Sequence, residues 1–319
     1  MTIWNQIDPM VRLIVAAILL ATLLPVTGTM RIYAQFASNV AVFTLFLLYG
    51  MRLYRGEVIA GLGNYRLLLP LTIWIFGAMG FAGWGLWQVS APFVPAALAL
   101  GFLYLGVLPS TVQSATVYSS LAGGNVASSV VAAALVNILA VFISIPLYSV
   151  LVGSHDTVFS GETLVKVMTM LLLPFLIGQA SQKFTSEWVS RNRPLMAKMD
   201  RGVIGLGVYV AFSGAVEQGI WHALDLGVWA VVVAACAVLL VFAYGGAWLL
   251  GGFLKLPRGD RIAMLFAGGQ KSIAMGAPLA TLLFPAATAG TVILPLLTYH
   301  LSQMLVAAPL ASRLSRKEG

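Results

Sequence analysis

Two clusters of polar side chains interrupt long apolar runs of this sequence, and they contain the residues best suited to bind an ion or a polar solute. An interrupted helix in a membrane leaves backbone N–H and C=O groups that lipid cannot satisfy, whereas a bound ion or solute can. The ends of the two half-helices add partial charges at the same place. The candidate substrate- or ion-binding residues are Thr111, Gln113 and Ser114 in the first cluster and Gln270, Lys271 and Ser272 in the second.

Lys271 is a basic residue near the middle of an apolar run, between Arg261 and Pro285. A lysine at the centre of a membrane helix costs about 2.5–3.5 kcal/mol on insertion scales. All ten acidic residues lie outside the centres of the runs, so we expect no carboxylate at the depth of this lysine. The free carbonyls of a broken helix or a water-filled cavity are then expected to solvate it. The alternative is a lysine near a helix end that extends to the headgroups.

Three further polar residues within the apolar runs are weaker candidates. Ser129 and Asn137 are eight residues apart, which places them on one helix face together with Ala133. They either line the binding site or hydrogen-bond between helices, and the sequence does not separate these alternatives. His300 could titrate near neutral pH, although a histidine that hydrogen-bonds between helices is the favoured interpretation.

The composition of the whole chain indicates where these clusters reside. Of its 319 residues, 60% are hydrophobic and 9% are charged, and the mean hydropathy is +0.95. A soluble domain carries about 25% charged residues, so this chain cannot cover a water-exposed surface. We predict a multi-pass integral membrane protein, with the lipid bilayer as its partner. Nucleic-acid binding is not expected, because the positive charges are spread between the runs.

Ten apolar runs are long enough to be membrane helices. Strands of a β-barrel are not expected, because no alternation with a period of two recurs. The first run lacks a cleavage site and is interpreted as a retained span. The predicted fold is an all-α membrane protein with about ten transmembrane helices in a single domain, 1–319. The runs, separated by short loops, cover residues 10–25, 34–50, 66–87, 93–121, 126–151, 163–181, 202–217, 223–252, 261–284 and 288–311.

The distribution of lysine and arginine orients these helices. With the N-terminus inside, only Arg31 and Lys166 of the 18 basic residues fall in outside loops, and Lys271 falls within a span. The positive-inside rule then supports ten helices with both termini in the cytoplasm. The expected location is the plasma membrane. The sequence carries no signal for an oligomeric state.

Ten helices divide into two halves of five, and an odd number per half means that a duplicated unit would be inverted. Repeat 1 would cover about 1–152 and repeat 2 about 160–312. The fourth helix of each half is the interrupted one. Paired interruptions at corresponding positions are the best sequence indication of a transporter site at the bilayer midplane. The alternative is that two unrelated kinks are accommodated by packing.

Enzymatic activity is not expected. Intramembrane proteases need paired acids, a metal-binding motif or a serine with a base in reach, and here Ser272 has only the distant His300. The single cysteine, Cys236, excludes an intrachain disulfide and a Cys-based metal site, and no cofactor is expected. A channel is disfavoured because no ring of acids or repeated filter sequence is visible.

These motifs resemble those of the bile acid/sodium symporter family, and in particular a divergent branch with vertebrate and bacterial members. The resemblance implies an inverted-repeat fold with a panel of helices 1, 2, 6 and 7 and a core of helices 3–5 and 8–10, in which the two broken helices cross. It also implies transport of an organic anion by alternating access. The stretches that carry the resemblance are Leu108–Ser114, Ala122–Ala127, Gly269–Ser272 and Gly276–Ala280.

The resemblance also exposes departures at the sodium sites of the family. Sodium-coupled members carry a glutamate where this chain has Phe266, and an asparagine where it has Ala115 or Thr116, depending on the register. A serine and a threonine of the fifth helix correspond to Ser129 and Ala133, so one oxygen is missing there. Hard cations need several oxygen ligands. At least one sodium site is therefore expected to be incomplete.

Lys271 stands where sodium-coupled members commonly carry a neutral residue. The hypothesis is that its ammonium takes the place and charge of a missing sodium ion. Because burial disfavours the charged form of a lysine, the coupling ion could be H⁺ instead of Na⁺. The alternative function is a non-transporting membrane regulator of ion flux that retains the symporter fold.

Overall fold

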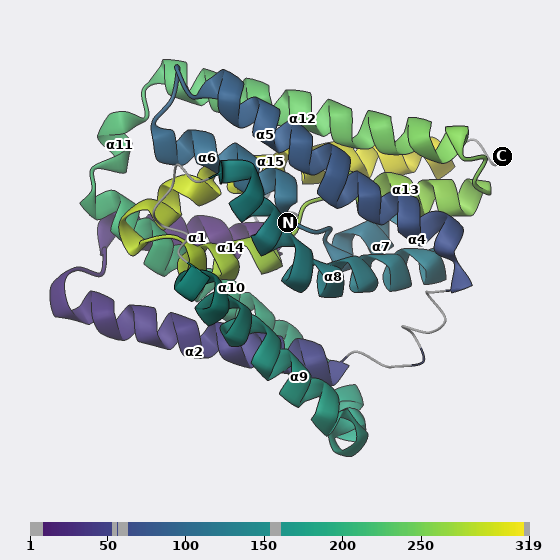
Figure 1. The fold of residues 1–319 in the computed structure, drawn as a ribbon, viewed down its shortest axis with the longest axis horizontal. Coiled ribbons are helices and arrows are strands. Elements are labelled where there is room, and N and C mark those ends of the chain that lie inside the picture. Colours follow the sequence, from purple (N-terminus) through teal and green to yellow (C-terminus); the bar gives the residue numbers. More distant parts are fainter. Residues whose placement is uncertain (1–8, 53–55, 57–62, 154–160, 316–319) are drawn as a thin grey trace, which may run out of the picture. The chain divides into compact units, whose positions relative to one another are not determined.

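The computed structural model describes residues 9–52, 56, 63–153 and 161–315, and all regular structure within these ranges is helical. This confirms the predicted all-α class. The helices are α1 (Pro9–Leu23), α2 (Gly28–Arg52), α4 (Tyr65–Thr72), the π-helix η2 (Ile73–Ala78), α5 (Met79–Ser90), α6 (Ala96–Val107), α7 (Val112–Leu121), α8 (Val126–Val152), α9 (Gly161–Arg191), α10 (Arg193–Glu217), α11 (Ile220–Ala223), α12 (Leu226–Phe253), α13 (Arg258–Gly269), α14 (Ile273–Leu283) and α15 (Ala286–Ser315) (Figure 1).

In the part of the chain that the structure describes, six helical segments are long and apolar enough to cross a membrane. They are α2, the continuous segment Tyr65–Ser90, α8, α10, α12 and α15. The pair α6 and α7, bent by 59° at a short break, can form a seventh span. The protein is therefore a multi-pass membrane protein, whereas the ten-span count and the inverted repeat stay predictions.

The chain forms two compact units. The first unit comprises Met1–Leu53, Thr157–Asp225 and Ala274–Ile293. Its helices α2 and α9 approach so closely that a Cβ atom on Gly50 would meet the backbone carbonyl of Phe175. Helix α2 is also joined to α10, because the two terminal guanidinium nitrogens of Arg52 each donate to the carboxylate of Asp200, at 2.6 and 2.9 Å. Close backbone packing and a bidentate ion pair therefore hold this unit together.

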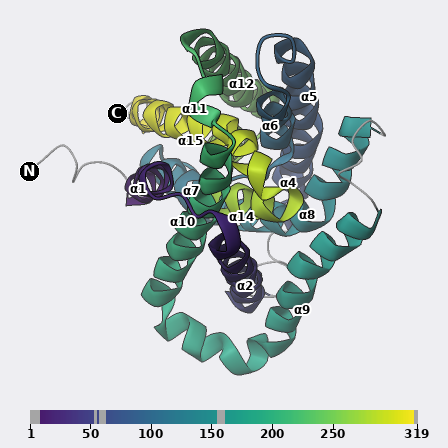
Figure 2. The same ribbon diagram turned by 90° about the vertical axis from the view of Figure 1, so that its left-hand side faces the viewer.

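The first unit also corrects one expectation. The loop predicted between the sixth and seventh runs is helical, because α9 continues to Arg191 and α10 begins at Arg193. Figure 2 shows the two helices meeting at a sharp turn. Apolar runs end where charged residues begin, but a helix can extend beyond the hydrocarbon into the polar interface. Pro194 lies in the first turn of α10, where its missing N–H group costs no hydrogen bond.

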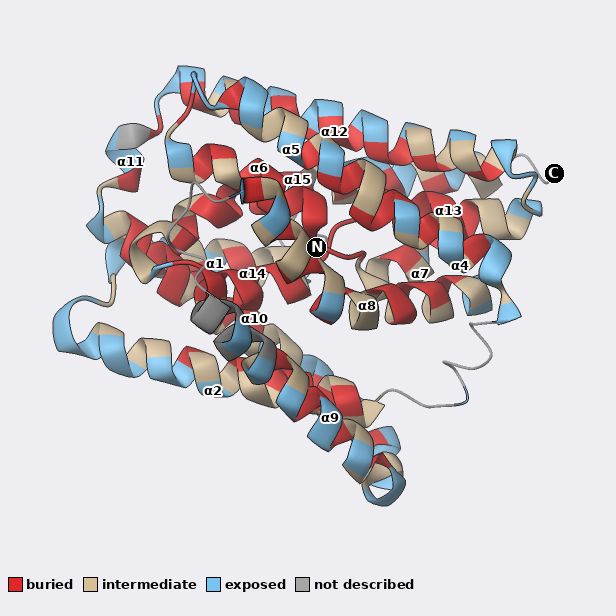
Figure 3. Ribbon diagram, in the orientation of Figure 1, coloured by how far each residue is buried: buried red, intermediate tan, exposed pale blue. Residues whose placement is uncertain are grey.

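The second unit comprises Tyr54–Asp156, Leu226–Ile273 and Leu294–Gly319. Helix α5 packs on α6 through two glycines, since a Cβ atom on Gly83 would lie 2.7 Å from the Cα atom of Gly106. The indole ring of Trp74, in η2, fills the space left by the missing side chains of Gly246 and Gly268. Helix α6 is buried along nearly its whole length (Figure 3). These contacts fix the position of the carbonyl groups at the end of α6.

Candidate functional site

Two breaks of helical structure contact each other within the second unit. Helix α6 ends at Val107 and α7 begins at Val112, while α13 ends at Gly269 and α14 begins at Ile273. The N–H group of Ser272 donates to the carbonyl of Pro109 at 2.9 Å. The hydroxyl of Thr111 donates to the carbonyl of Lys271, also at 2.9 Å. The breaks therefore satisfy part of each other's backbone polar groups, as buried polar groups require.

The ammonium group of Lys271 is enclosed by carbonyl oxygens. Its side chain is fully buried, and Nζ donates to the carbonyls of Gly106 at 2.6 Å and Leu108 at 2.7 Å. A longer contact of 3.4 Å reaches the carbonyl of Ile75 in η2. The first two carbonyls belong to the C-terminal end of α6, where a helix carries partial negative charge. A π-helical turn, often found at functional sites, supplies the third.

These bonds can offset the cost of burying the charge. Hydrogen bonds to a charged group contribute about 1.5–3 kcal/mol each, against about 2.5–3.5 kcal/mol for a lysine at the centre of a span. Within the described residues the ammonium bonds to these carbonyls and to no carboxylate. Asp8, Glu57, Asp156 and Glu318 lie outside the described residues. Among the residues that the structure describes, backbone carbonyls and not a carboxylate therefore solvate this lysine.

Gln303, in α15, holds the backbone of Lys271 and was not predicted from the sequence. Its side chain is fully buried. Its Oε1 accepts a hydrogen bond from the N–H group of Lys271 at 2.8 Å, and its Nε2 donates to the carbonyl of the same residue at 3.1 Å. Nε2 also lies 3.0 Å from Nδ1 of His300, one helical turn earlier. A glutamine three residues after a candidate histidine in an apolar run was the available signal.

An aromatic cluster surrounds Phe266, the position at which the family resemblance implies a glutamate in sodium-coupled members. Phe266 is fully buried, with its ring stacked 5.9 Å from that of Tyr118 and edge-on to Tyr244 at 6.2 Å. Beside it, the buried Gln270 accepts a hydrogen bond from the hydroxyl of Ser114 through Oε1. The cluster provides no carboxylate to a cation at this position.

Three further predicted residues, Asn137, Ser129 and Gln113, differ in their contacts and burial. The amide of Asn137 donates to the carbonyl of Ser110 in the first break, at 2.7 Å. Ser129 pairs with Ser119 at 3.1 Å, and the side chain of Gln113 is exposed. Asn137 therefore supports the first break, Ser129 joins α8 to α7, and neither Gln113 nor Ser129 bonds to Lys271.

We expect Asn137→Leu to destabilise the protein by about 1–3 kcal/mol, because the buried carbonyl of Ser110 would lose its donor. The measurement is the midpoint of thermal unfolding in detergent. Gln113→Leu is the control, and its exposed side chain predicts a change within about 0.5 kcal/mol. Equal midpoints for the two variants would contradict this role of Asn137.

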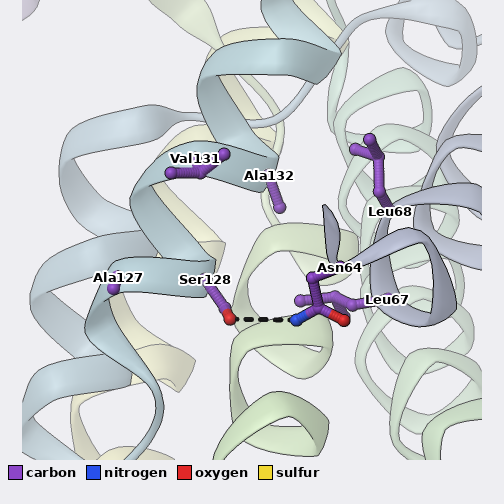
Figure 4. A pocket seen from close by; sticks show the side chains of 7 residues that line it. All are labelled: Asn64, Leu67, Leu68, Ala127, Ser128, Val131 and Ala132. Carbon is purple, nitrogen blue, oxygen red and sulfur yellow. Dashed lines mark hydrogen bonds between the residues drawn. The ribbon is translucent and has the colours of Figure 1, made fainter. Parts of the chain in front are cut away.

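A small cavity of about 150 Å³ lies elsewhere in the second unit, at the N-terminal ends of α4 and α8. None of the predicted site residues lines it. The amide of Asn64 donates there to the hydroxyl of Ser128 at 3.1 Å (Figure 4) and to Asp260 at 3.2 Å. Asn125, which caps α8, donates to the same carboxylate at 2.8 Å. Asp260 therefore connects the starts of three helices. The cavity is lined by Asn64, Leu67, Leu68, Ala127, Ser128, Val131 and Ala132.

The described residues contain no group of three or more His, Cys, Asp or Glu side chains that could hold a metal ion. The oxygen atoms gathered at the two breaks are instead carbonyls, hydroxyls and amides. Such neutral oxygens suit a monovalent cation or an ammonium group better than a transition metal.

Comparison with known proteins places this geometry in context. The model of a family described as the SBF-like CPA transporter family matches residues 8–316. An uncharacterized protein of Pseudomonas aeruginosa is 36% identical over 305 residues, which cover 95% of this chain and 92% of the relative. The protein named "Putative symporter YfeH" of Escherichia coli is 37% identical over 322 residues, with coverage of 99% and 96%. Sodium/bile acid cotransporter 7 of Rattus norvegicus is 23% identical over 291 residues, with coverage of 86% and 81%.

Proposed function

Because this chain belongs to the SBF-like CPA transporter family, we propose that it is a secondary active transporter of a small organic anion in which the Lys271 ammonium replaces a coupling sodium ion. Members of this family are membrane transporters and not enzymes. The observation that carries the proposal is the buried ammonium, which donates to the carbonyls of Gly106 and Leu108 at the broken end of α6.

The chemistry of the site supports the replacement of sodium. Backbone carbonyls at a helix C-terminus are the ligands that unwound transporter helices offer to Na⁺. Here the lysine already uses them, and Phe266 stands at the position where the family resemblance implies a glutamate in sodium-coupled members. A second cation next to the ammonium would meet a like charge in a site that excludes water. Transport is therefore proposed to be independent of Na⁺, with H⁺ as the alternative coupling ion.

The choice of an organic anion rests on charge and on relatives. Helix α7 begins at the first break, so its N-terminal N–H groups carry partial positive charge near the fixed charge of Lys271. Several relatives are named sodium/bile acid cotransporters. An amphipathic carboxylate or sulfonate is the substrate class that fits both observations.

Alternating access is supported by the division of the chain into two units. Helices α1, α2, α9 and α10, which correspond to the expected panel, fall in the first unit. Helices α4 to α8, α12 and α13, which belong to the expected core, fall in the second. Helix α14 and the start of α15 group with the first unit, which departs from the predicted core. We propose that the ten spans form an inverted repeat, that the termini are cytoplasmic, and that transport moves the two parts relative to each other.

The test uses the purified protein in liposomes, with radiolabelled taurocholate as the organic anion. We expect equal uptake in Na⁺ and in choline at the same ionic strength, and an unfolding midpoint that does not rise with Na⁺ relative to K⁺. Lys271→Gln should lower uptake at least about tenfold and change its pH dependence, because the neutral amide cannot replace the charge-assisted bonds. Sodium-dependent uptake, or a Lys271→Gln variant with unchanged uptake and pH profile, would refute the proposal.

The same liposomes test the alternative function, a non-transporting regulator of ion flux. Such a regulator would carry no taurocholate and no other organic anion in a purified system, yet its expression would change cation flux in cells. Counterflow with a panel of labelled bile acids and sulfonates separates an inactive fold from a transporter with another substrate.

A further inference from the structure

Gln303 and His300 form a chain of hydrogen bonds that ends on the backbone of Lys271. We infer that Gln303 is a positioning residue for Lys271, and that protonation of His300 at Nδ1 breaks the hydrogen bonds between Gln303 and the backbone of Lys271. The inference deepens the proposed function, on which its importance for transport rests. Its geometry, however, depends only on atoms of α15 and of the second break.

The orientation of the Gln303 amide follows from its partners. The N–H group of Lys271 can only donate, so the atom that faces it at 2.8 Å must be the oxygen Oε1. The carbonyl of Lys271 can only accept, so the atom 3.1 Å from it must be the nitrogen Nε2. Both ends of the amide are therefore assigned by the backbone of one residue.

This orientation determines the protonation state of the histidine. Nε2 of Gln303 has no lone pair to accept with, and it lies 3.0 Å from Nδ1 of His300. Nδ1 must therefore accept, which leaves His300 neutral, with its proton on Nε2. Both side chains are almost fully buried, so water cannot easily insert between them.

A proton on Nδ1 would break this arrangement. Two donors would then face each other across 3.0 Å. A half-turn of the Gln303 amide would relieve that clash. It would, however, place the amide nitrogen against the N–H group of Lys271 and the amide oxygen against its carbonyl, so both hydrogen bonds would be lost. A protonated His300 and an intact Gln303–Lys271 pair therefore exclude each other. Release of this backbone pair would loosen the break that carries the ammonium.

Within the described residues, neighbouring elements bring several titratable groups to this part of α15, among them Tyr244 of α12, which interacts electrostatically with Tyr299. Helix α12 contributes Cys236, whose thiol donates to the carbonyl of Pro295 at 3.4 Å, and α7 contributes Tyr118, whose hydroxyl contacts Met304. Tyr299 of α15 donates to the carbonyl of Gly269 at 2.6 Å. The second break contributes Lys271, the charged side chain that this chain of bonds connects to His300.

The test is hydrogen–deuterium exchange of the Lys271 amide in the full-length protein, isolated by peptides that end on either side of it. Rates are corrected for intrinsic exchange and compared at about pH 8 and about pH 5, on either side of the ordinary histidine value of about 6.5. We expect protection in the wild type to fall about tenfold at the lower pH, as loss of a buried hydrogen bond predicts.

Three variants separate positioning from general damage. Asparagine can accept where Nδ1 does but does not titrate, so His300→Asn should keep protection at both pH values. Gln303→Met should lose it at both. Gln179→Met removes a hydrogen bond from a side-chain amide to the carbonyl of Gly50 in the first unit, and it should behave as the wild type.

Constant wild-type protection across the pH range, a pH-dependent His300→Asn variant, or full protection in Gln303→Met would each overturn the inference. Exchange at Lys271 does not report on ion coupling. Sodium-dependent uptake would therefore refute the proposed function and leave this result intact, and unchanged protection would do the reverse.

Discussion

In a Lys271→Ala variant we expect taurocholate uptake to fall at least about tenfold and methylammonium to restore part of it. The substitution removes the buried ammonium and leaves the carbonyls of Gly106 and Leu108 without their donor. Each buried, unsatisfied group costs about 1–3 kcal/mol. A small cation that enters the vacated space would recover these bonds, whereas alanine cannot.

Thermal unfolding measures this rescue without knowledge of the substrate. A ligand at 100 times its Kd stabilises the folded state by about 2.7 kcal/mol, so the unfolding midpoint of Lys271→Ala should rise with methylammonium. Tetramethylammonium, which has no N–H donor, should give no rise. Lys198→Ala, an exposed lysine of the first unit, is the control and should respond to neither. Identical responses of the two alanine variants would contradict a cation site at the α6 terminus.

Gly83→Ala is expected to destabilise the protein by about 3 kcal/mol, at the upper end of the range for overpacking. The added Cβ atom would lie 2.6 Å from the carbonyl of Phe102 and 2.7 Å from the Cα atom of Gly106. Both are backbone atoms, so a side-chain rotation cannot relieve the collision and α6 must move. Because the carbonyl of Gly106 binds the Lys271 ammonium, transport should be lost together with stability.

Gly85→Ala provides the matched control for this prediction. It lies two residues further along α5, and a Cβ atom there would meet nothing within 4 Å. The unfolding midpoints of the two variants, measured with uptake in liposomes, give the comparison. A Gly83→Ala protein as stable and active as Gly85→Ala would show that the close approach of α5 and α6 is dispensable.

The parts of this molecule that the sequence predicts well are those with a strong local signal. Proline, glycine and polar residues in apolar runs predict non-helical segments, and the helices do stop at Val107 and Gly269. The resemblance to the symporter family, drawn from the same segments, is confirmed by the family match over residues 8–316. With it, the predicted membership of a family of membrane transporters, and not of enzymes, is confirmed.

Other features depend on tertiary contacts, for which the local sequence gives a weak signal or none. Gln303 lies 32 residues from the lysine that it holds. The π-helix Ile73–Ala78 has an ordinary apolar sequence. Its Trp74 packs against Gly246 and Gly268, and these contacts cannot be recognised from the local sequence. The helical segment up to Arg191 escapes a hydrophobicity criterion because it is charged. Which solute and which ion the site takes stays a prediction.

The ammonium of Lys271 is covalently attached to the polypeptide, so it cannot dissociate during the transport cycle as a free sodium ion does. A free sodium ion leaves its site on the inner side, and each charge released gains about 2.3 kcal/mol per 100 mV of membrane potential. The ammonium of Lys271 returns with the chain, so over a full cycle it carries no net charge across the membrane. A carrier built on this lysine therefore draws no energy from the sodium gradient. It can accumulate its solute, as a secondary active transporter does, only if a proton leaves the lysine on one side of the membrane and is regained on the other.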